Sequence, residues 1–272
     1  MQALEFHQGG RSGVGCSIWL LSGTGDGPPL AQDLLQRGWR VHVGVVTPEA
    51  ARAYESHPHL SVQIGALEQD GAVAAVLDAL RPDWVVDCTH PFASEISARL
   101  ERVCRGRQQR LLRLDRSLVE DKTPSHPLST ITALEDLRSL PLEQERLLLA
   151  IGSRHLAAAL GASPAREHFA RILDRPLSLQ QALASGLSPD RIACVRPGHL
   201  AGGALESALC RHWGISAVLC RQSGGPVEQL WHELAAREGL HLILLSPPGS
   251  PGEQALPLQA LLEKLGAPSS QA

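Results

Sequence analysis

The chain has 272 residues, of which 43% are hydrophobic and 19% charged, as in an ordinary globular protein that buries one large core or two smaller ones. Its formal net charge of −3 gives no field that would attract nucleic acid or an anionic membrane, so neither is expected as a partner. No apolar run reaches the ~20 residues that a membrane-spanning helix needs, and no signal-peptide pattern is present, so we expect a cytoplasmic protein.

The cysteines and histidines do not form recognisable metal motifs. The six cysteines are spread singly along the chain without a C-x-x-C pair, and no H-E-x-x-H motif occurs. We therefore expect neither a disulfide framework nor a metal site. The cysteines are interpreted as small buried hydrophobes in a reducing compartment.

The first part of the chain alternates apolar strands with helices. We expect strands over residues 17–21, 41–46, 61–64, 84–87 and 111–114. Helices are expected over residues 29–37, 71–80 and 93–105. Continuous apolar strands that alternate with amphipathic helices predict a parallel sheet covered on both faces.

A polar segment with two prolines, residues 117–129, predicts a linker, after which the same plan repeats. The second series of strands is expected over residues 146–151, 169–173, 191–195, 217–221 and 240–245. Its helices are expected over residues 155–160, 178–185, 201–213, 227–238 and 258–265. The sequence thus predicts two doubly wound, Rossmann-like α/β domains, residues 17–128 and 129–266, with parallel sheets and a cleft between them.

A glycine-rich segment, Ser22 to Gly27, follows the first strand and opens the first helix. Glycines let the backbone approach a phosphate, and a helix N-terminus adds unpaired N–H groups. Gly23, Thr24 and Gly25 are therefore candidate contacts for a dinucleotide. The spacing is not G-x-G-x-x-G, and a tight turn without a ligand would read the same way. Asp26 would repel a phosphate, so we expect its carboxylate to cap the helix.

The end of the second strand carries Thr47, with Arg52 a few residues on. A hydroxyl beside a guanidinium suits a 2′-phosphate, which favours NADPH over NADH. Glu49 favours NADH instead, and an ordinary capped helix start would also explain the pattern.

Residues 87–93, Asp-Cys-Thr-His-Pro-Phe-Ala, follow the fourth predicted strand, at a position where ligands bind in open α/β sheets. A helix start capped by Thr89, with Pro91 in its first turn, would explain two of these residues. It would not require His90 and Phe92, whose imidazole and aromatic ring suit a cofactor edge and a flat substrate. Thr89, Pro91 and Phe92 are therefore candidate cofactor contacts, with His90 as the candidate catalytic group.

The same string resembles the D-A-T-H-P-[FY]-A signature of precorrin-6A reductases, the nicotinamide-dependent enzymes of corrin-ring biosynthesis. Four other segments agree in order: Ser22–Gly27 with the family's G-T loop, 109–116 with its R-x-x-R strand, 151–156 with its G-S-[KR]-x-L loop and 221–225 with its K-x-S-G-G motif. The resemblance runs from about Ser17 to Pro247. Arg221 stands where the family has lysine, Pro226-Val227-Glu228 replaces a glycine-rich tail, and Ser246-Pro247 replaces a closing R-P.

The resemblance implies a hydride transfer from NADPH, or from NADH, to a double bond of precorrin-6A or cobalt-precorrin-6A, giving the dihydro product in cobalamin biosynthesis. His90 is implied as the proton donor or orienting group, since imidazole titrates near neutral pH. Neighbouring enzymes of the corrin pathway are further candidate partners. The residues implied for the carboxylate-bearing tetrapyrrole substrate are Arg113, Arg116, Gly152, Ser153, Arg154, Arg221, Ser223, Gly224 and Gly225.

Two other functions fit the same fold. One is a non-catalytic protein that binds a tetrapyrrole or a nucleotide, since fold does not fix function. The other is an unrelated Rossmann-type oxidoreductase. Against the short-chain type of such enzymes stands the absence of a Tyr-x-x-x-Lys pair, because the one tyrosine, Tyr54, has no lysine near it.

Overall fold

The computed structural model describes residues 16–23, 25–116, 125–195, 201–249 and 254–268. The chain divides into two compact units. Unit 1 comprises Met1–Arg116 together with Gly249–Ala272, and unit 2 comprises Ser117–Pro248. Unit 1 is therefore built from two separate stretches of the chain, whereas the sequence predicted one continuous domain after the other.

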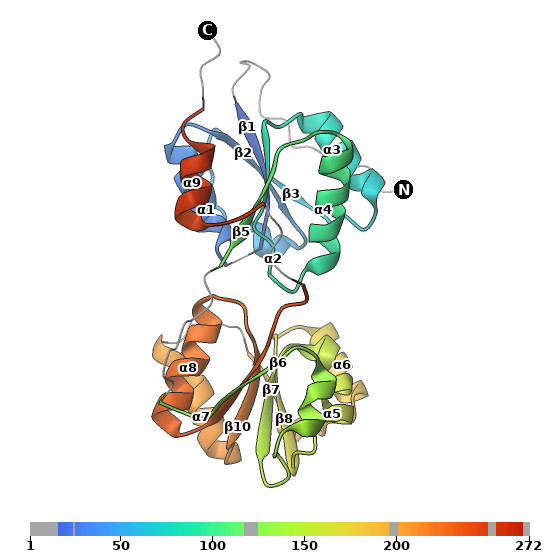
Figure 1. Ribbon diagram of the computed structural model, residues 1–272, viewed down its shortest axis with the longest axis vertical. Helices are drawn as coiled ribbons and strands as arrows, with labels where there is room; N and C mark the ends of the chain where they lie inside the picture. The colour runs from blue at the N-terminus through green and yellow to red at the C-terminus, as the bar shows by residue number, and fades with distance from the viewer. Residues whose placement is uncertain (1–15, 24, 117–124, 196–200, 250–253, 269–272) are drawn as a thin grey trace. The chain divides into compact units, whose positions relative to one another are not determined.

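Unit 1 has an α/β fold built on one parallel sheet (Figure 1). Its strands are β1 (Ser17–Leu21), β2 (Arg40–Val45), β3 (Leu60–Ile64), β4 (Trp84–Asp87), β5 (Leu111–Asp115) and β12 (Ala255–Pro257). They form a six-stranded sheet in the order β12-β5-β4-β1-β2-β3, and every pairing is parallel. Its helices are α1 (Gly27–Gln36), α2 (Pro48–Ala51), α3 (Asp70–Leu80), α4 (Ser94–Gly106) and α9 (Leu258–Leu265).

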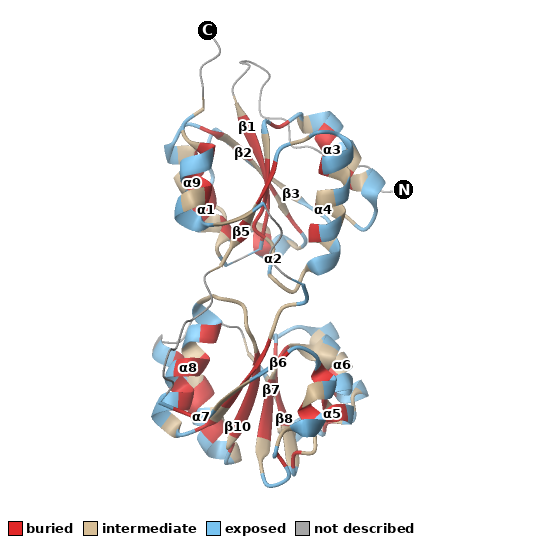
Figure 2. Cartoon of the chain, viewed as in Figure 1, coloured by how far each residue is buried: buried red, intermediate tan, exposed pale blue. Residues whose placement is uncertain are grey.

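The central strand β1 is buried along its whole length because helices cover both faces of the sheet. Ile18 and Leu20 pack in one hydrophobic cluster with side chains of α1 and α9. Trp19 and Leu21 point to the other face and pack with α3 and α4. Figure 2 shows this pattern as buried strands between helices that are exposed on their outer sides. The continuous apolar strand is thus explained by a core on each face.

Unit 2 repeats the plan (Figure 1). Its strands are β6 (Leu128–Ile131), β7 (Arg146–Ala150), β8 (Glu167–Ile172), β9 (Ile192–Cys194), β10 (Ala217–Arg221) and β11 (His241–Leu245). The sheet order is β6-β11-β10-β7-β8-β9, again parallel throughout. Its α-helices are α5 (Leu156–Ala162), α6 (Pro176–Ala184), α7 (Ala204–Trp213) and α8 (Pro226–Glu238). Short 3₁₀ helices, η1 to η4, span Leu134–Ser139, Ser153–His155, Pro189–Arg191 and Ala201–Gly203.

Each sheet has one point at which the chain reverses its direction of winding. In unit 1 the chain runs from β1 to β2 and β3, and then returns to β4 on the other side of β1. In unit 2 the corresponding neighbours are β7 and β10. Loops that leave the carboxyl ends of two such strands diverge to opposite faces and leave a crevice for a ligand. All the motifs recognised in the sequence lie at or near the carboxyl ends of the strands of these two sheets.

The predicted fold class, two Rossmann-like α/β units with parallel sheets, is confirmed, as are the main strands and helices, but the predicted domain bounds need two corrections. The predicted linker, 117–129, contains the start of edge strand β6, which pairs with β11 in unit 2. The last strand and helix, β12 and α9, belong to unit 1, where β12 pairs with β5. Leu261 of α9 packs in the core beside Leu30 and Leu34 of α1. An amphipathic helix fits either core, so its position in the chain did not identify the unit it completes.

Two smaller expectations concern cysteines and membranes. Four of the six cysteines are buried as expected, whereas Cys16 is half-buried and Cys194 is exposed. No three His, Cys, Asp or Glu side chains of the described residues are grouped so as to hold a metal ion. Of the helices in the described ranges, none has the length and apolar character to cross a membrane.

Candidate active site

The loop after β1 carries glycines that the fold itself does not require. Gly23 and Gly25 are exposed, and neither has a positive φ. A Cβ added at either position would have no described atom within 4 Å beyond its chain neighbours. No contact among the described residues therefore explains the absence of side chains here. The backbone is instead open to close approach from outside. Thr24, the third predicted contact of this loop, lies outside the described residues.

Gly27, by contrast, is required by internal packing. A Cβ at Gly27 would lie 1.8 Å from Oγ of Ser22 and 2.2 Å from the hydroxyl of Tyr54. The Tyr54 hydroxyl donates a hydrogen bond of 2.8 Å to the carbonyl oxygen of Gly23. The start of α1 thus leaves room for a tyrosine that holds the loop. Sequence reasoning had no signal for this contact, because Tyr54 lies outside every recognised motif.

Asp26 does not cap α1 with its side chain, so that prediction is wrong. A capping side chain accepts from the N–H of the second or third helical residue, and here these are Pro28 and Pro29, which have none. The Asp26 carboxylate instead accepts a hydrogen bond of 2.5 Å from Nε of Arg116. The negative charge that would repel a phosphate is therefore paired with a guanidinium.

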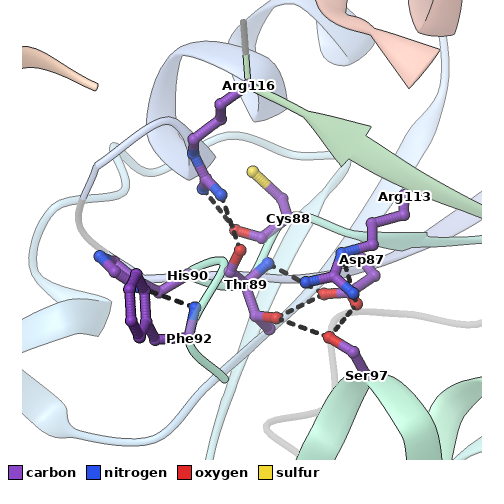
Figure 3. A network of polar contacts seen from close by, with 8 residues as sticks. All are labelled: Asp87, Cys88, Thr89, His90, Phe92, Ser97, Arg113 and Arg116. Carbon is purple, nitrogen blue, oxygen red and sulfur yellow. Dashed lines mark hydrogen bonds and ion pairs between the residues drawn. The ribbon is translucent and has the colours of Figure 1, made fainter. Parts of the chain in front are cut away.

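Arg116 also holds the loop that follows β4 (Figure 3). Its Nη1 donates to the carbonyl oxygen of Thr89 at 2.8 Å, and its Nη2 donates to that of Cys88 at 3.2 Å. Arg116 thus joins the loops after β1 and β4 from the end of β5. Its predicted role as a substrate ligand stays a prediction, and the structure gives it this second, structural task.

Asp87 organises the signature loop from inside. Its side chain is 2% exposed, and its Oδ1 accepts from the amide of Thr89 at 3.0 Å and from the Thr89 hydroxyl at 2.6 Å. Its Oδ2 accepts from the hydroxyl of Ser97 at 2.6 Å and lies 3.8 Å from Nε of Arg113 (Figure 3). Thr89 is therefore not a helix cap: α4 begins at Ser94 with Ala93 as its N-cap. The interpretation of residues 87–93 as an ordinary helix start is wrong.

His90 and Phe92 lie next to each other on this loop (Figure 3). Their ring centroids are 5.7 Å apart, and the rings are tilted by 48°. Nδ1 of the exposed His90 accepts a hydrogen bond of 3.2 Å from the amide of Phe92. A neutral imidazole that accepts at Nδ1 carries its proton at Nε2, so this contact fixes the tautomer. The loop therefore presents an N–H donor beside an aromatic ring.

The end of β2 shows the capped helix start that was one of the alternatives. The hydroxyl of Thr47 accepts from the amide of Ala50 at 3.3 Å and caps α2, and Arg52 is exposed at the end of that helix. Two large aliphatic side chains are exposed at the same sheet edge, Val46 by 64% and Ile64 by 47%. The roles of Thr47 and Arg52 as cofactor contacts stay a prediction. The exposed side chains of Val46 and Ile64 add an apolar surface at the ends of β2 and β3.

In unit 2, two basic side chains gather at the ends of β7 and β10. Gly152, after β7, has a φ of 85°, which favours glycine, and precedes Ser153, whose hydroxyl donates to Oε1 of Gln181 at 2.8 Å. Burial and the neighbouring Arg154 lower the pKa of Arg221. Burial and the positive charges of Arg221 and Arg154 also lower the pKa of His155. Arg154 and Arg221 thus place two positive charges near each other at this edge of the sheet.

The loop after β10 is held by a carboxylate that sequence reasoning missed. Glu228 is fully buried, and its Oε2 accepts from the amides of Ser223 at 2.5 Å and Gly224 at 2.6 Å. Glu228 belongs to the Pro-Val-Glu stretch that departs from the resembled family pattern. The amides of Ser223 and Gly224, just before α8, thus already donate to a carboxylate of the protein. What Ser223, Gly224 and Gly225 offer a substrate remains a prediction, and other atoms of the loop would have to supply it.

Comparison with known proteins identifies the family. Residues 17–265 match the model of the family described as precorrin-6x reductase CbiJ/CobK. The chain belongs to this family. A cobalt-precorrin-6A reductase of Synechocystis sp. is 31% identical over 240 residues, which cover 87% of this chain and 91% of the relative. A precorrin-6A reductase of Mycobacterium tuberculosis is 29% identical over 236 residues, covering 85% and 88% of the two chains.

The fold agrees with a solved family structure. The structure titled CobK precorrin-6A reductase matches with a TM-score of 0.72 and 23% identity, and covers 92% of this chain and 96% of that one. The resemblance inferred from the sequence is confirmed, and so is the expected class, a reductase in cobalamin biosynthesis. The alternative of an unrelated Rossmann-type oxidoreductase is wrong.

Proposed function

We propose that this reductase transfers a hydride from NADPH to a double bond of precorrin-6A or cobalt-precorrin-6A. The observation that carries the cofactor part is the exposed loop after β1. No described residue would be met by a Cβ at Gly23 or Gly25, and the loop after β4 carries His90 and Phe92 at the switch point of the same sheet. A dinucleotide that approaches the backbone closely would supply a reason for glycine at both positions.

The described residues fit such a cofactor. The pyrophosphate would lie against the loop after β1, and Arg116 removes the repulsion by pairing with Asp26. Main-chain amides of the loop would be the donors, since Pro28 and Pro29 remove two of those that a helix start usually offers. Val46 and Ile64 would cover a purine ring, and Thr47 with Arg52 would bind a 2′-phosphate, which favours NADPH.

The reacting groups would meet at the loop after β4. When bound, the reduced nicotinamide supplies the hydride. The hydride would add to one carbon of a double bond conjugated to a C=N group, the electron pair of that double bond would move to the ring nitrogen, and that nitrogen would take up a proton from water. As a neutral imidazole, His90 would donate a hydrogen bond from Nε2–H to that nitrogen and so orient the macrocycle, while Asp87 keeps the loop in place. Orientation and electrostatic support would do most of the work.

The substrate's rim carboxylates would bind arginines. Arg154 and Arg221 place two positive charges near each other at the edge of unit 2 and would attract an anion there. Guanidinium groups hold carboxylates with two parallel hydrogen bonds, so the replacement of the family lysine by Arg221 keeps the charge and adds a donor fork. Arg113 is a further candidate, because its guanidinium touches the Asp87 carboxylate only at 3.8 Å.

The cofactor proposal is tested by titrating the protein with NADPH and with NADH while nicotinamide fluorescence is recorded. Gly25→Ala adds a methyl group into open space, so it disturbs a bound ligand rather than the fold. Gly106→Ala at the end of α4 is the matched control, since its added Cβ also meets open space. We expect micromolar binding of NADPH, weakened about tenfold or more by Gly25→Ala and unchanged by Gly106→Ala. The proposal would be contradicted if Gly25→Ala and Gly106→Ala bound NADPH with the same Kd. It would also be contradicted if the wild type bound neither NADPH nor NADH, even with macrocycle present.

A further inference from the structure

Tyr54 connects two strand-end loops of unit 1. It lies three residues beyond α2, in the segment that joins β2 to β3, and its hydroxyl reaches back to the carbonyl oxygen of Gly23 in the loop after β1. The phenol fits there because Gly27 has no side chain: a Cβ would stand 2.2 Å from the hydroxyl. A glycine in α1 and a hydrogen bond to the loop together define a slot for this side chain.

The surroundings keep the phenol protonated. Burial raises the pKa of Tyr54 to about 12. A Cβ added at Gly27 would meet Oγ of Ser22 as well as the Tyr54 hydroxyl, so both hydroxyls lie beside this glycine. The thiol of Cys88, after β4, also lies close, and burial raises its pKa to about 11. Tyr54 is therefore a neutral donor at any physiological pH, at a point where the loops after β1, β2 and β4 come together.

We infer that Tyr54 is a positioning residue for the dinucleotide. It engages the Gly23 carbonyl oxygen, which carries partial negative charge and would otherwise be available to repel a pyrophosphate at the exposed loop. It also ties this loop to the segment that carries Thr47 and Arg52, so that it sets the distance between the pyrophosphate and a 2′-phosphate. The inference rests on the proposed cofactor site and adds to it a residue that does not touch the reacting atoms.

The test compares Tyr54→Phe with the wild type and with Ser61→Ala. The first removes one hydroxyl and its bond to Gly23 and retains the ring. The second removes a hydroxyl that bonds His42 on the neighbouring strand, away from the loop. Each protein is measured for the Kd of NADPH and NADH, the KM of the macrocycle, kcat at saturating NADPH, and Tm.

For Tyr54→Phe we expect the Kd of NADPH to rise about five- to tenfold, a typical effect of losing one hydrogen bond. The KM of the macrocycle and kcat at saturating NADPH should stay at wild-type values, and the preference for NADPH over NADH should fall. Ser61→Ala should bind like the wild type.

Unchanged NADPH binding in Tyr54→Phe would overturn the inference. So would a raised macrocycle KM with NADPH binding intact, or the same loss of NADPH binding in Ser61→Ala. In each of these cases the proposed cofactor site would still be supported if the wild type binds NADPH and Gly25→Ala binds it more weakly. A wild type that binds neither nucleotide with macrocycle present would instead overturn the proposed function, and the inference with it.

Discussion

The sharpest stability prediction concerns Asp87→Asn, which removes a buried charge without changing the shape of the side chain. The carboxylate accepts three hydrogen bonds, two from Thr89 and one from Ser97, and lies 3.8 Å from the Arg113 guanidinium. Together these contacts hold the loop that carries His90. The loop's conformation should therefore depend on this one carboxylate.

The magnitude follows from what the amide can still do. Its oxygen can replace Oδ1 and keep both contacts to Thr89, but as neutral bonds of roughly half the strength. Its NH2 group then replaces Oδ2 and faces Arg113, donor against donor. Ser97 can turn its hydroxyl to accept, so that bond survives in weaker form. Summing the weakened bonds and the lost ion pair gives a destabilisation of about 2–3 kcal/mol.

The assay is calorimetric and urea-induced unfolding, followed by tryptophan fluorescence, with Ser97→Ala as a graded control. Since the chain has two units, each can unfold in its own transition, and only that of unit 1 should move. A loss of this size lowers Tm by roughly 6–12 °C in a unit of about 140 residues. Ser97→Ala should cost about half as much. A free energy of unfolding for Asp87→Asn within about 0.5 kcal/mol of the wild type would refute the reasoning.

Three further predictions concern the second unit, the chemistry and pH. Arg221→Ala should raise the KM of the macrocycle about 10- to 100-fold and leave the Kd of NADPH unchanged, with Arg221→Lys between the two; an unchanged macrocycle KM would contradict this. His90→Asn should lower kcat about 100-fold in steady-state assays, whereas full turnover with normal substrate affinity would remove the proposed role. Burial lowers the pKa of four histidines, so the unfolded state binds more protons than the folded state below their usual pKa of 6.5. Tm should therefore fall as the pH is lowered below about 6.5, and a flat or rising Tm would contradict this sign. The four are His42, His155, His168 and His241.

The fold was largely predictable because its signal is local. A strand buried on both faces, such as β1, reads as an uninterrupted apolar run, and the helices between strands show their own apolar stripes. Edge elements lack this signal. The three residues of β12 are too few to show a pattern, and Leu128 to Ile131 has only one buried side chain. Their placement depends on pairing with β5 and β11, which the chain order does not state.

The candidate site divides in the same way. Its position was predictable, since strand ends and glycine loops are visible in the sequence and the switch point brings them to one edge. The side-chain contacts that hold the loops of the site together were not predictable. Arg116 reaches Asp26 across 90 positions of the sequence and Tyr54 reaches Gly23 across 31, and such pairs emerge only from the tertiary fold. The two prolines after Gly27 did contain a local signal against the predicted Asp26 cap.

The most direct test of the account is a single turnover of the protein with deuterated NADPH and each macrocycle, precorrin-6A and cobalt-precorrin-6A, under anaerobic conditions. NADPH loss is followed by absorbance, and the product is analysed by mass spectrometry. We expect one NADPH to be consumed per macrocycle, and one of the two macrocycles to gain the deuterium together with a proton. A protein that binds both nucleotide and macrocycle but leaves NADPH unoxidised and the macrocycle mass unchanged would contradict this expectation.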